Sequence, residues 1–259
     1  MSNFYQLRIQ YFGSQYFGWQ IQADQLTIQG ELEKALKRAF PKNKIKTLGA
    51  SRTDKGVHAL DQLCKLSINC DVPEKNLLKA INDQLPAEII IKEVFKTTEE
   101  FHPIYDVKEK TYLYLFKFYP DKPNIFEKKF SHYEPFNLNL EKMNEAAKLF
   151  VGEHDFVNYY TLGSEVSTTI RTIYNSEILN FKDLNFPISF PRDVYALKIS
   201  GNGFLKQMIR LIMGTLIEIG KEKITLVDIE KSLSEKLPRK LSKVLDPRGL
   251  FLNDIKVKV

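Results

Sequence analysis

Hydrophobic and polar residues follow clear periods through the first hundred residues, which predict four strands and two helices. Tyr5, Leu7 and Ile9 alternate with polar neighbours, as in a half-buried strand. Ile28, Leu32 and the following apolar positions recur at helical spacing after a possible Thr27 cap. In full, we predict strands over residues 5–11, 45–48, 60–68 and 89–95, and helices over 28–39 and from Pro73 through residue 81.

The rest of the chain repeats this mixture. Residues 111–118 form a strongly β-prone run with aromatic side chains at alternate positions. We predict further strands over residues 170–181, 193–199 and 250–257, and helices over 143–150, 204–219 and 225–233. Strands that neighbour one another in sequence and mix with helices favour an α+β fold with largely antiparallel sheets. We divide the chain into two mixed α/β halves, residues 1–105 and 106–259.

Composition adds little to this picture except a moderate positive charge. The chain has 259 residues, is 43% hydrophobic and carries a formal charge of +6. Such an excess permits nucleic-acid binding without requiring it. The apolar stretch 204–219 contains Lys206 and Arg210 and is too short to cross a bilayer. With no signal peptide evident, we expect a cytoplasmic protein that has no contact with a membrane.

Cysteine and histidine residues give no support to a disulfide or a metal centre. Cys64 and Cys70 are six residues apart in one predicted strand, hence separated by about 20 Å. A disulfide requires Cα atoms within roughly 7 Å. The four histidines are scattered, and no CxxC or HxxxH pair occurs. We therefore expect two small buried apolar cysteines and no structural zinc.

The segment Gly49–Ala59 carries the most chemistry of any short stretch. It joins two predicted strands and places Arg52, Asp54, Lys55 and His58 within seven residues. Loops held by rigid strands are frequent positions for catalytic groups. The alternative is a solvated turn with an Asx-type hydrogen bond at Asp54.

This segment resembles the catalytic loop of the TruA-type pseudouridine synthases, whose pattern is (G/A)-R-T-D-x-G-V-H-A. Other blocks of that family follow in order along nearly the whole chain. They are Tyr16–Gln20, Thr27–Gly30, Phe101–Pro103, Lys110–Tyr114, Gly152–Phe156, Arg171–Ile173, Gly201–Leu205, Met208–Arg210 and Gly249–Leu252. So many blocks in one order make a chance match implausible.

The resemblance implies an enzyme that isomerises uridine to pseudouridine in tRNA, around positions 38 to 40 of the anticodon stem-loop. It implies two halves around a central substrate cleft, and a homodimer. Asp54 would be the catalytic carboxylate, and Arg52 would fill the place of the extruded uracil. Tyr112 would stack on that base and Leu250 would form an apolar floor below it. The isomerisation transfers no electrons, so we expect no cofactor.

Arg210 is a candidate partner for Asp54 on physical grounds. It stands in an otherwise apolar helical run, and a buried arginine nearly always has a carboxylate partner. Such a cation would keep Asp54 ionised. The alternative is a structural ion pair with another acid. For Tyr112 the alternative is a core tyrosine, and for Trp19 we favour a core position. Thr53 and His58 fit a scaffolding role.

Several positions depart from the family pattern. Ser51 and Lys110 replace commoner residues, Lys206–Gln207 replace a more basic pair, and residues 243–248 match only loosely. These changes affect substrate choice more than chemistry. One rival interpretation is a non-catalytic tRNA-binding protein or RNA chaperone, which would not need Asp54. Another is a carboxylate hydrolase or metal enzyme, which needs a second carboxylate or a histidine cluster.

Overall fold

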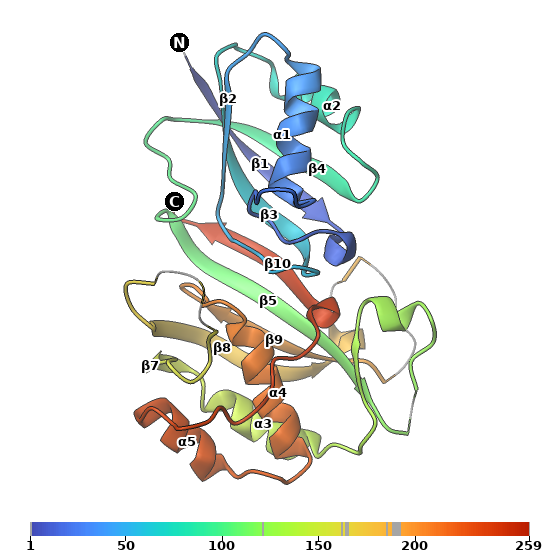
Figure 1. Cartoon of the computed structure of the whole chain (residues 1–259), viewed down its shortest axis with the longest axis vertical. Helices are drawn as coiled ribbons and strands as arrows, with labels where there is room; N and C mark the ends of the chain where they lie inside the picture. The colour runs from blue at the N-terminus through green and yellow to red at the C-terminus, as the bar shows by residue number, and fades with distance from the viewer. Residues whose placement is uncertain are drawn as a thin grey trace. The chain divides into compact units, whose positions relative to one another are not determined.

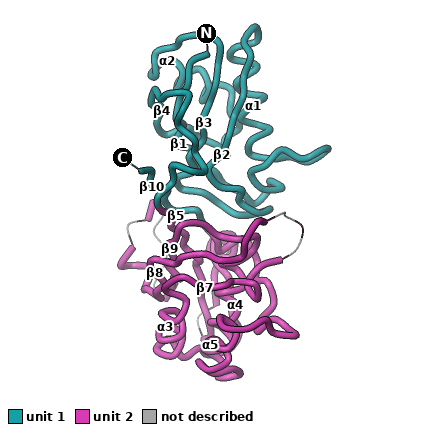
Figure 2. The backbone as a smooth tube through the Cα atoms, turned by 90° about the vertical axis from the view of Figure 1, so that its left-hand side faces the viewer, with its two compact units in different colours: residues 1–108, 251–259 teal, residues 109–250 magenta. Residues whose placement is uncertain are grey.

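The computed structural model describes residues 2–120, 122–161, 163, 166–184, 186–187 and 193–258. The chain divides into two compact units (Figure 2). Unit 1 comprises residues 1–108 and 251–259, and unit 2 comprises residues 109–250. The chain thus leaves unit 1 once and returns to it for its last strand. The sequence analysis had assigned that last strand to the second half.

Unit 1 is an antiparallel sheet with one parallel addition and two helices (Figure 1). The strands follow the order β4–β1–β3, and both β2 and β10 pair with β3. β10 joins β3 in parallel, with Phe251 opposite His58. The elements are β1 (Asn3–Tyr11), α1 (Ile28–Ala39), β2 (Ile45–Gly49), β3 (His58–Ile68), α2 (Glu74–Asn82), β4 (Ile89–Thr97) and β10 (Leu250–Val257).

The two helices of unit 1 begin where their sequences provide caps. The Thr27 side chain accepts a hydrogen bond from the Gly30 amide, as an N-cap residue should. Pro73 occupies the N-cap position of α2. The apolar faces of the helices are fully buried through Leu32, Leu36, Leu77 and Ile81. α1 packs against β2 and α2 against β4, and the helices also touch each other (Figure 1).

The strands of unit 2 follow the order β5–β9–β8–β7, with β6 parallel to β5. The other pairs are antiparallel. α3 packs on β8 and α4, and α5 lies against β7. The elements are β5 (Val107–Phe118), β6 (His132–Glu134), α3 (Leu140–Lys148), β7 (Gly152–Asp155), β8 (Ile170–Asn180), β9 (Tyr195–Gly201), α4 (Met208–Gly220) and α5 (Leu226–Ser234).

The α+β class and the largely antiparallel sheets are confirmed. Two helix boundaries differ from the prediction: α4 begins at Met208 rather than near residue 204, and α3 spans Leu140–Lys148 rather than 143–150. Gln207 adopts a left-handed conformation, with φ of 61°, which interrupts the helix on its N-terminal side. The strands β6 and β7 were not predicted, because three or four residues are too few to establish a period.

Two earlier expectations concerned the burial of the cysteines and the absence of a helix that could cross a membrane. Both cysteines are free; Cys64 is buried, whereas Cys70 follows β3 and is only half-buried. Burial raises the pKa of the Cys64 thiol to about 12, so this thiol is neutral at physiological pH. In the part of the chain that is described, none of the helices combines the length and apolar character needed to traverse a bilayer.

Candidate active site

The Arg52–Asp54 loop connects β2 to β3 in unit 1. Along it the burial of the side chains alternates: Arg52 is exposed, Thr53 is buried and Asp54 is half-buried. A buried residue between two more accessible ones fixes the backbone while leaving both neighbours near the surface of the unit. This arrangement suits a loop that presents a cation and a carboxylate to a ligand.

The middle of the loop is tied to the segment that follows β1. The hydroxyl groups of Tyr11 and Thr53 are 2.8 Å apart and share a hydrogen bond. The Trp19 amide donates to the Thr53 carbonyl over 3.1 Å, and the Gly56 amide donates to the Tyr16 carbonyl over 3.1 Å. These three hydrogen bonds, two from the backbone and one from a side chain, therefore hold the loop before and after Asp54.

The ends of the loop are fixed as well. Gln62, fully buried on β3, accepts a bond from the Ser51 amide and donates one to the Ser51 carbonyl. His58 Nδ1 accepts from the Gly13 amide over 3.1 Å, and its ring stacks on Phe251 with a centroid distance of 4.7 Å. The scaffolding roles expected for Thr53 and His58 are confirmed by these contacts.

Glycine is required at position 18 by close approach of the backbones. Gly18 has a φ of +94°, a region that side-chain-bearing residues rarely adopt. A Cβ atom there would lie 2.5 Å from the Thr53 carbonyl oxygen. The loop can approach this closely only because residue 18 has no side chain.

The other predicted site residues lie in unit 2. Tyr112 on β5 is 6% exposed and contacts Phe204 edge-to-face at 5.2 Å. Leu250 is 5% exposed at the start of β10. Arg210 on α4 is 9% exposed, and its Nε donates to the Leu245 carbonyl over 2.7 Å. That bond holds one edge of the guanidinium and orients the rest of the group.

Two residues near Tyr112 have shifted pKa values. Burial, together with the Arg171 charge, lowers the pKa of Lys110 to about 8. Burial also raises the pKa of the Tyr114 phenol, despite the opposing charge of Arg210. The Tyr114 hydroxyl donates to the Asp246 carbonyl over 2.8 Å, so this tyrosine is structural. Its side chain is completely buried.

Trp19 is only 1% exposed, as predicted. Its indole ring packs against the backbone of Gly49, where the loop begins. The sequence analysis missed Tyr11, Gln62 and Gly13 as supports of the loop. Gln62 carried a usable signal, since it is a polar residue on the apolar face of a predicted strand. Tyr11 and Gly13 carried none, because their partners are more than forty residues away in sequence.

Arg52 and Asp54 thus lie in unit 1, whereas Tyr112, Arg210 and Leu250 lie in unit 2. The pairing of Asp54 with Arg210 stays a prediction. Within the described residues, no group of three or more His, Cys, Asp or Glu side chains could hold a metal ion.

Comparison with known proteins assigns the chain to a family. The family model for tRNA pseudouridine synthases matches residues 8–106 and 146–256. The tRNA pseudouridine synthase A of Caldicellulosiruptor bescii is 34% identical over 249 residues, 96% of this chain and 97% of that protein. The enzyme of the same name from Oceanobacillus iheyensis is 37% identical over 245 residues, 94% and 92% of the two chains.

A solved structure, the crystal structure of a Cbf5–Nop10–Gar1 complex, also aligns with the chain. The alignment has a TM-score of 0.35 and 14% identity, and it covers 81% of this chain and 46% of the other. The assignment does not depend on so distant a similarity. It depends on the family match and on relatives that align along almost their entire length. The chain therefore belongs to the tRNA pseudouridine synthase family.

Proposed function

We propose that this chain isomerises uridine to pseudouridine in tRNA and that Asp54 is the catalytic carboxylate. The observation that carries the proposal is the Arg52–Asp54 loop in a member of this family. Hydrogen bonds fix the positions of Thr53, Gly56 and His58 in this loop. Arg52 and Asp54 remain closer to the surface. Such preorganisation is what a positioned catalytic group needs.

The reaction asks for little more than one well-placed carboxylate. The bond from uracil N1 to ribose C1′ breaks and a bond from C5 to C1′ forms, with no net redox change. Asp54 could attack C1′, attack uracil C6, or remove the C2′ proton; all three routes need its ionised form. No step requires an electron carrier.

Arg210 is the proposed cation that keeps Asp54 ionised. Its Nε–Leu245 bond fixes the guanidinium of a nearly buried side chain. The alternative partner is Asp246. Burial acts to raise the pKa of that carboxyl, but hydrogen bonds from Arg248 and the charges of Arg248 and Arg210 hold it below its ordinary range. Arg210 can serve both carboxylates, because a guanidinium has five N–H donors.

The remaining roles concern the target nucleotide. Arg52, exposed and planar at its tip, would occupy the gap left by the extruded uracil. Tyr112 would stack on the base, and Leu250 would support it from below. We further propose that the target lies in the anticodon stem-loop, around positions 38 to 40, and that the enzyme acts as a homodimer.

Incubation of the protein with total tRNA, followed by carbodiimide primer extension, tests the function directly. New stops at uridines in the anticodon stem-loop are expected. Full conversion in the presence of a chelator would exclude the metal-enzyme alternative. Tight tRNA binding without any stops would favour the RNA chaperone instead.

Tyr112 variants separate stacking from hydrogen bonding. Tyr112→Phe keeps the aromatic face, so its conversion rate should stay within a few-fold of the wild type. Tyr112→Leu loses the stacking contact, worth about 1–3 kcal/mol, and should lower the rate by about tenfold or more. Single-turnover rates on an anticodon stem-loop RNA measure both. Equal impairment of the two variants would show that stacking is not the main contribution.

The affinity for RNA should depend on pH through the charge of Lys110. Its pKa of about 8 lies below the ordinary lysine value, so its positive charge is present below pH 8 and is lost as the pH rises through 8. The dissociation constant for tRNA should then rise by about threefold between pH 7 and 9, because the protein loses one positive charge that attracts the polyanion. In Lys110→Arg the charge persists and this component should vanish. Filter binding at constant ionic strength provides the measurement.

A further inference from the structure

Unit 2 contains a pocket whose lining, apart from Arg210, has no part in the proposed chemistry. Its volume is about 640 Å³. Three parts of the chain line it: Lys128 with residues 131–133, Arg210 of α4, and the strap of residues 243–248 that leads to β10. Four basic side chains line it, against one carboxylate from Asp246. They are Lys128, Arg210, Lys243 and Arg248.

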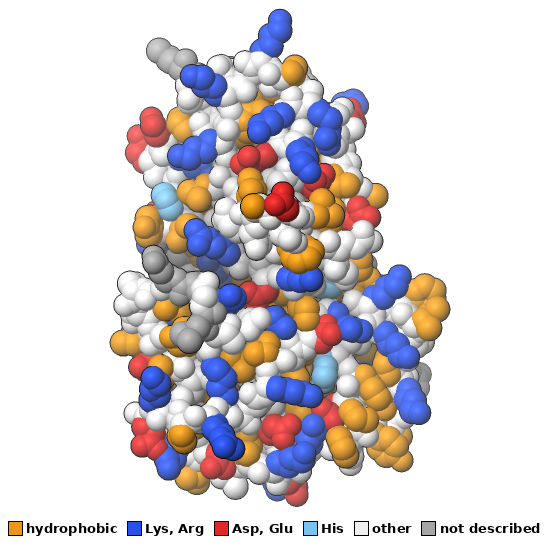
Figure 3. All heavy atoms as spheres, viewed as in Figure 1, with side chains coloured by type: hydrophobic (Ala, Val, Ile, Leu, Met, Phe, Trp, Pro, Cys, Tyr) orange, Lys and Arg blue, Asp and Glu red, His pale blue; other side chains and the backbone are white. Residues whose placement is uncertain are grey.

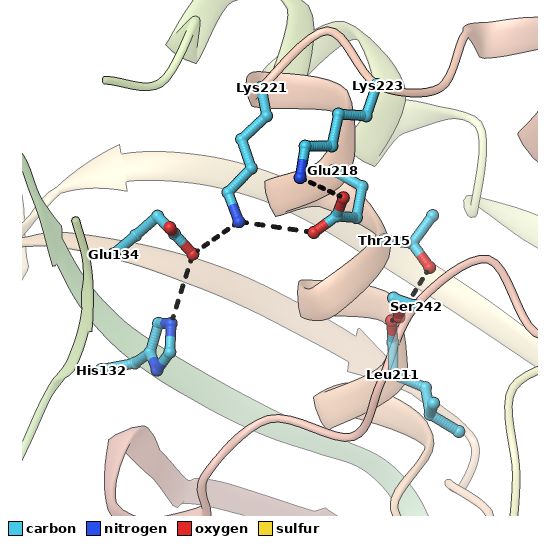
Figure 4. Close-up of polar contacts among 8 residues, drawn as sticks. All are labelled: His132, Glu134, Leu211, Thr215, Glu218, Lys221, Lys223 and Ser242. Atoms are coloured by element: carbon cyan, nitrogen blue, oxygen red, sulfur yellow. Dashed lines mark hydrogen bonds and ion pairs between the residues drawn. The ribbon is translucent and has the colours of Figure 1, made fainter. Parts of the chain in front are cut away.

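The strap is fixed to α4 at its first residues. A Cβ atom at Gly214 would lie 2.7 Å from the Lys243 carbonyl oxygen, so the two backbones touch. The Ser242 hydroxyl donates to the Leu211 carbonyl over 3.0 Å, and Thr215 contacts the same hydroxyl (Figure 4). The backbone that carries Lys243 therefore has a defined position.

The other end of the strap is attached to β5 and to the opposite wall. Tyr114 donates its hydroxyl proton to the Asp246 carbonyl. A Cβ atom at Gly249 would lie 2.6 Å from the Leu115 carbonyl oxygen. The Arg248 guanidinium connects the strap to the opposite wall, since its Nη1 donates to the Lys128 carbonyl over 3.1 Å.

The 128–133 wall has its own support. The Glu134 carboxylate forms an ion pair with Lys221 at 2.9 Å. It also lies 3.9 Å from His132 (Figure 4). Burial acts to raise the pKa of Glu134, but contacts with His132 and Lys221 hold this pKa below its ordinary value. The wall residue His132 is thereby linked to α4 through two charged side chains.

The charges in the pocket favour an anion. Asp246 is already occupied, because its carboxylate pairs with Arg248 at 2.8 Å and caps the turn at Pro247–Gly249. The ammonium groups of Lys128 and Lys243 come from exposed residues, and no ion pair of either is among the contacts that the structure describes. A third cation, Arg210, is held at the pocket wall. An anion that enters would face the ammonium groups of Lys128 and Lys243, which line the pocket from two different segments.

We propose that this pocket binds a backbone phosphate of the RNA strand. The proposal rests on the function proposed above. A strand is favoured over free phosphate because the charge continues outside the pocket: Lys129 adjoins Lys128, and blue side chains gather among orange ones over the segment between β5 and β6 (Figure 3). The volume also exceeds what one phosphate ion fills. A phosphate held beside Arg210 would fix the register of the strand near the target nucleotide.

Salt-dependent RNA binding tests the pocket. We compare wild type, the double variant Lys128→Ala/Lys243→Ala and the control Lys148→Ala, which removes an exposed lysine of α3 outside the pocket. The dissociation constant for unmodified tRNA is measured by filter binding over a range of potassium chloride concentrations. The double variant should bind about tenfold more weakly, and its log–log salt slope should fall by about one to two. The control should change neither quantity.

The conservative double variant Lys128→Arg/Lys243→Arg keeps both charges. It should therefore show the RNA affinity and the salt slope of the wild type. Melting curves confirm that all the variants are folded. A double variant whose affinity and slope equal those of the control would overturn the proposal. Binding of inorganic phosphate that the double variant abolishes, with no change in the affinity or the salt slope for RNA, would make the pocket a free-phosphate site and would also overturn the proposal.

The same proteins separate this proposal from the proposed function. Pseudouridine is mapped by primer extension at saturating tRNA. Conversion by the wild type with no slope difference would refute the pocket and keep the enzyme. A slope difference without any conversion would refute the enzyme and keep the pocket.

Discussion

Asp54→Asn is expected to abolish pseudouridine formation, with a single-turnover rate at least about a thousandfold below the wild type. The amide has the size of the carboxylate but cannot act as nucleophile or base. Carbodiimide primer extension over a long time course measures the residual rate. Affinity for tRNA should stay within about tenfold, because many phosphate contacts contribute to binding.

Asp83→Asn is a matched control in the same unit. Asp83 is an exposed carboxylate at the end of α2, paired with Lys79 on the surface. Its amide variant should convert tRNA at the normal rate. If Asp54→Asn isomerises RNA as quickly as this control does, Asp54 is not catalytic. A parallel loss of tRNA binding and of thermal stability would instead indicate a structural role.

Gly18→Ala is expected to lower activity by about a hundredfold, although residue 18 takes no part in the chemistry. The new methyl group would lie 2.5 Å from the Thr53 carbonyl oxygen on a backbone with φ of +94°. The loop must move, and displacement of a catalytic group by about 1 Å can cost that factor. The strain should also lower the free energy of unfolding by about 2–4 kcal/mol.

Gly203→Ala shows what an alanine costs where there is room. The atoms nearest to a Cβ there lie 3.8 Å away, in the Arg171 side chain. Its melting temperature should remain close to that of the wild type, whereas that of Gly18→Ala should fall by several degrees. Native stability and full activity in Gly18→Ala would show that the loop adapts without cost.

Local patterns were sufficient to predict most of the fold. The strand β1 and the helix α1, with its Thr27 cap, appear where alternation and helical spacing place them. The start of α4 was wrong because one left-handed residue, Gln207, overrides an apolar run. The pairing of β10 with β3 was not predicted, because it joins residues almost two hundred positions apart.

The candidate site divides in the same way. Asp54 and Arg52 stand out in a short charged segment, but their expected roles came from the family resemblance, whereas Arg210 was found as a single cation in an apolar helix. The pocket beside Arg210 was missed, since Lys128 and Lys243 are far apart in sequence and neither interrupts a pattern. The loosely matching stretch 243–248, rich in charge next to Pro247, was the only local hint.

The pairing of β10 with β3 has a consequence for the order in which the protein matures. During synthesis residues 251–258 leave the ribosome after the rest of unit 1 and the whole of unit 2. Until then, His58 has no Phe251 ring to stack on and the adjoining edge of β3 is open. The support of the Asp54 loop is completed only once β10 has been made, after all of unit 2. Nascent or C-terminally shortened chains should therefore be inactive, even where their unit 2 is fully formed.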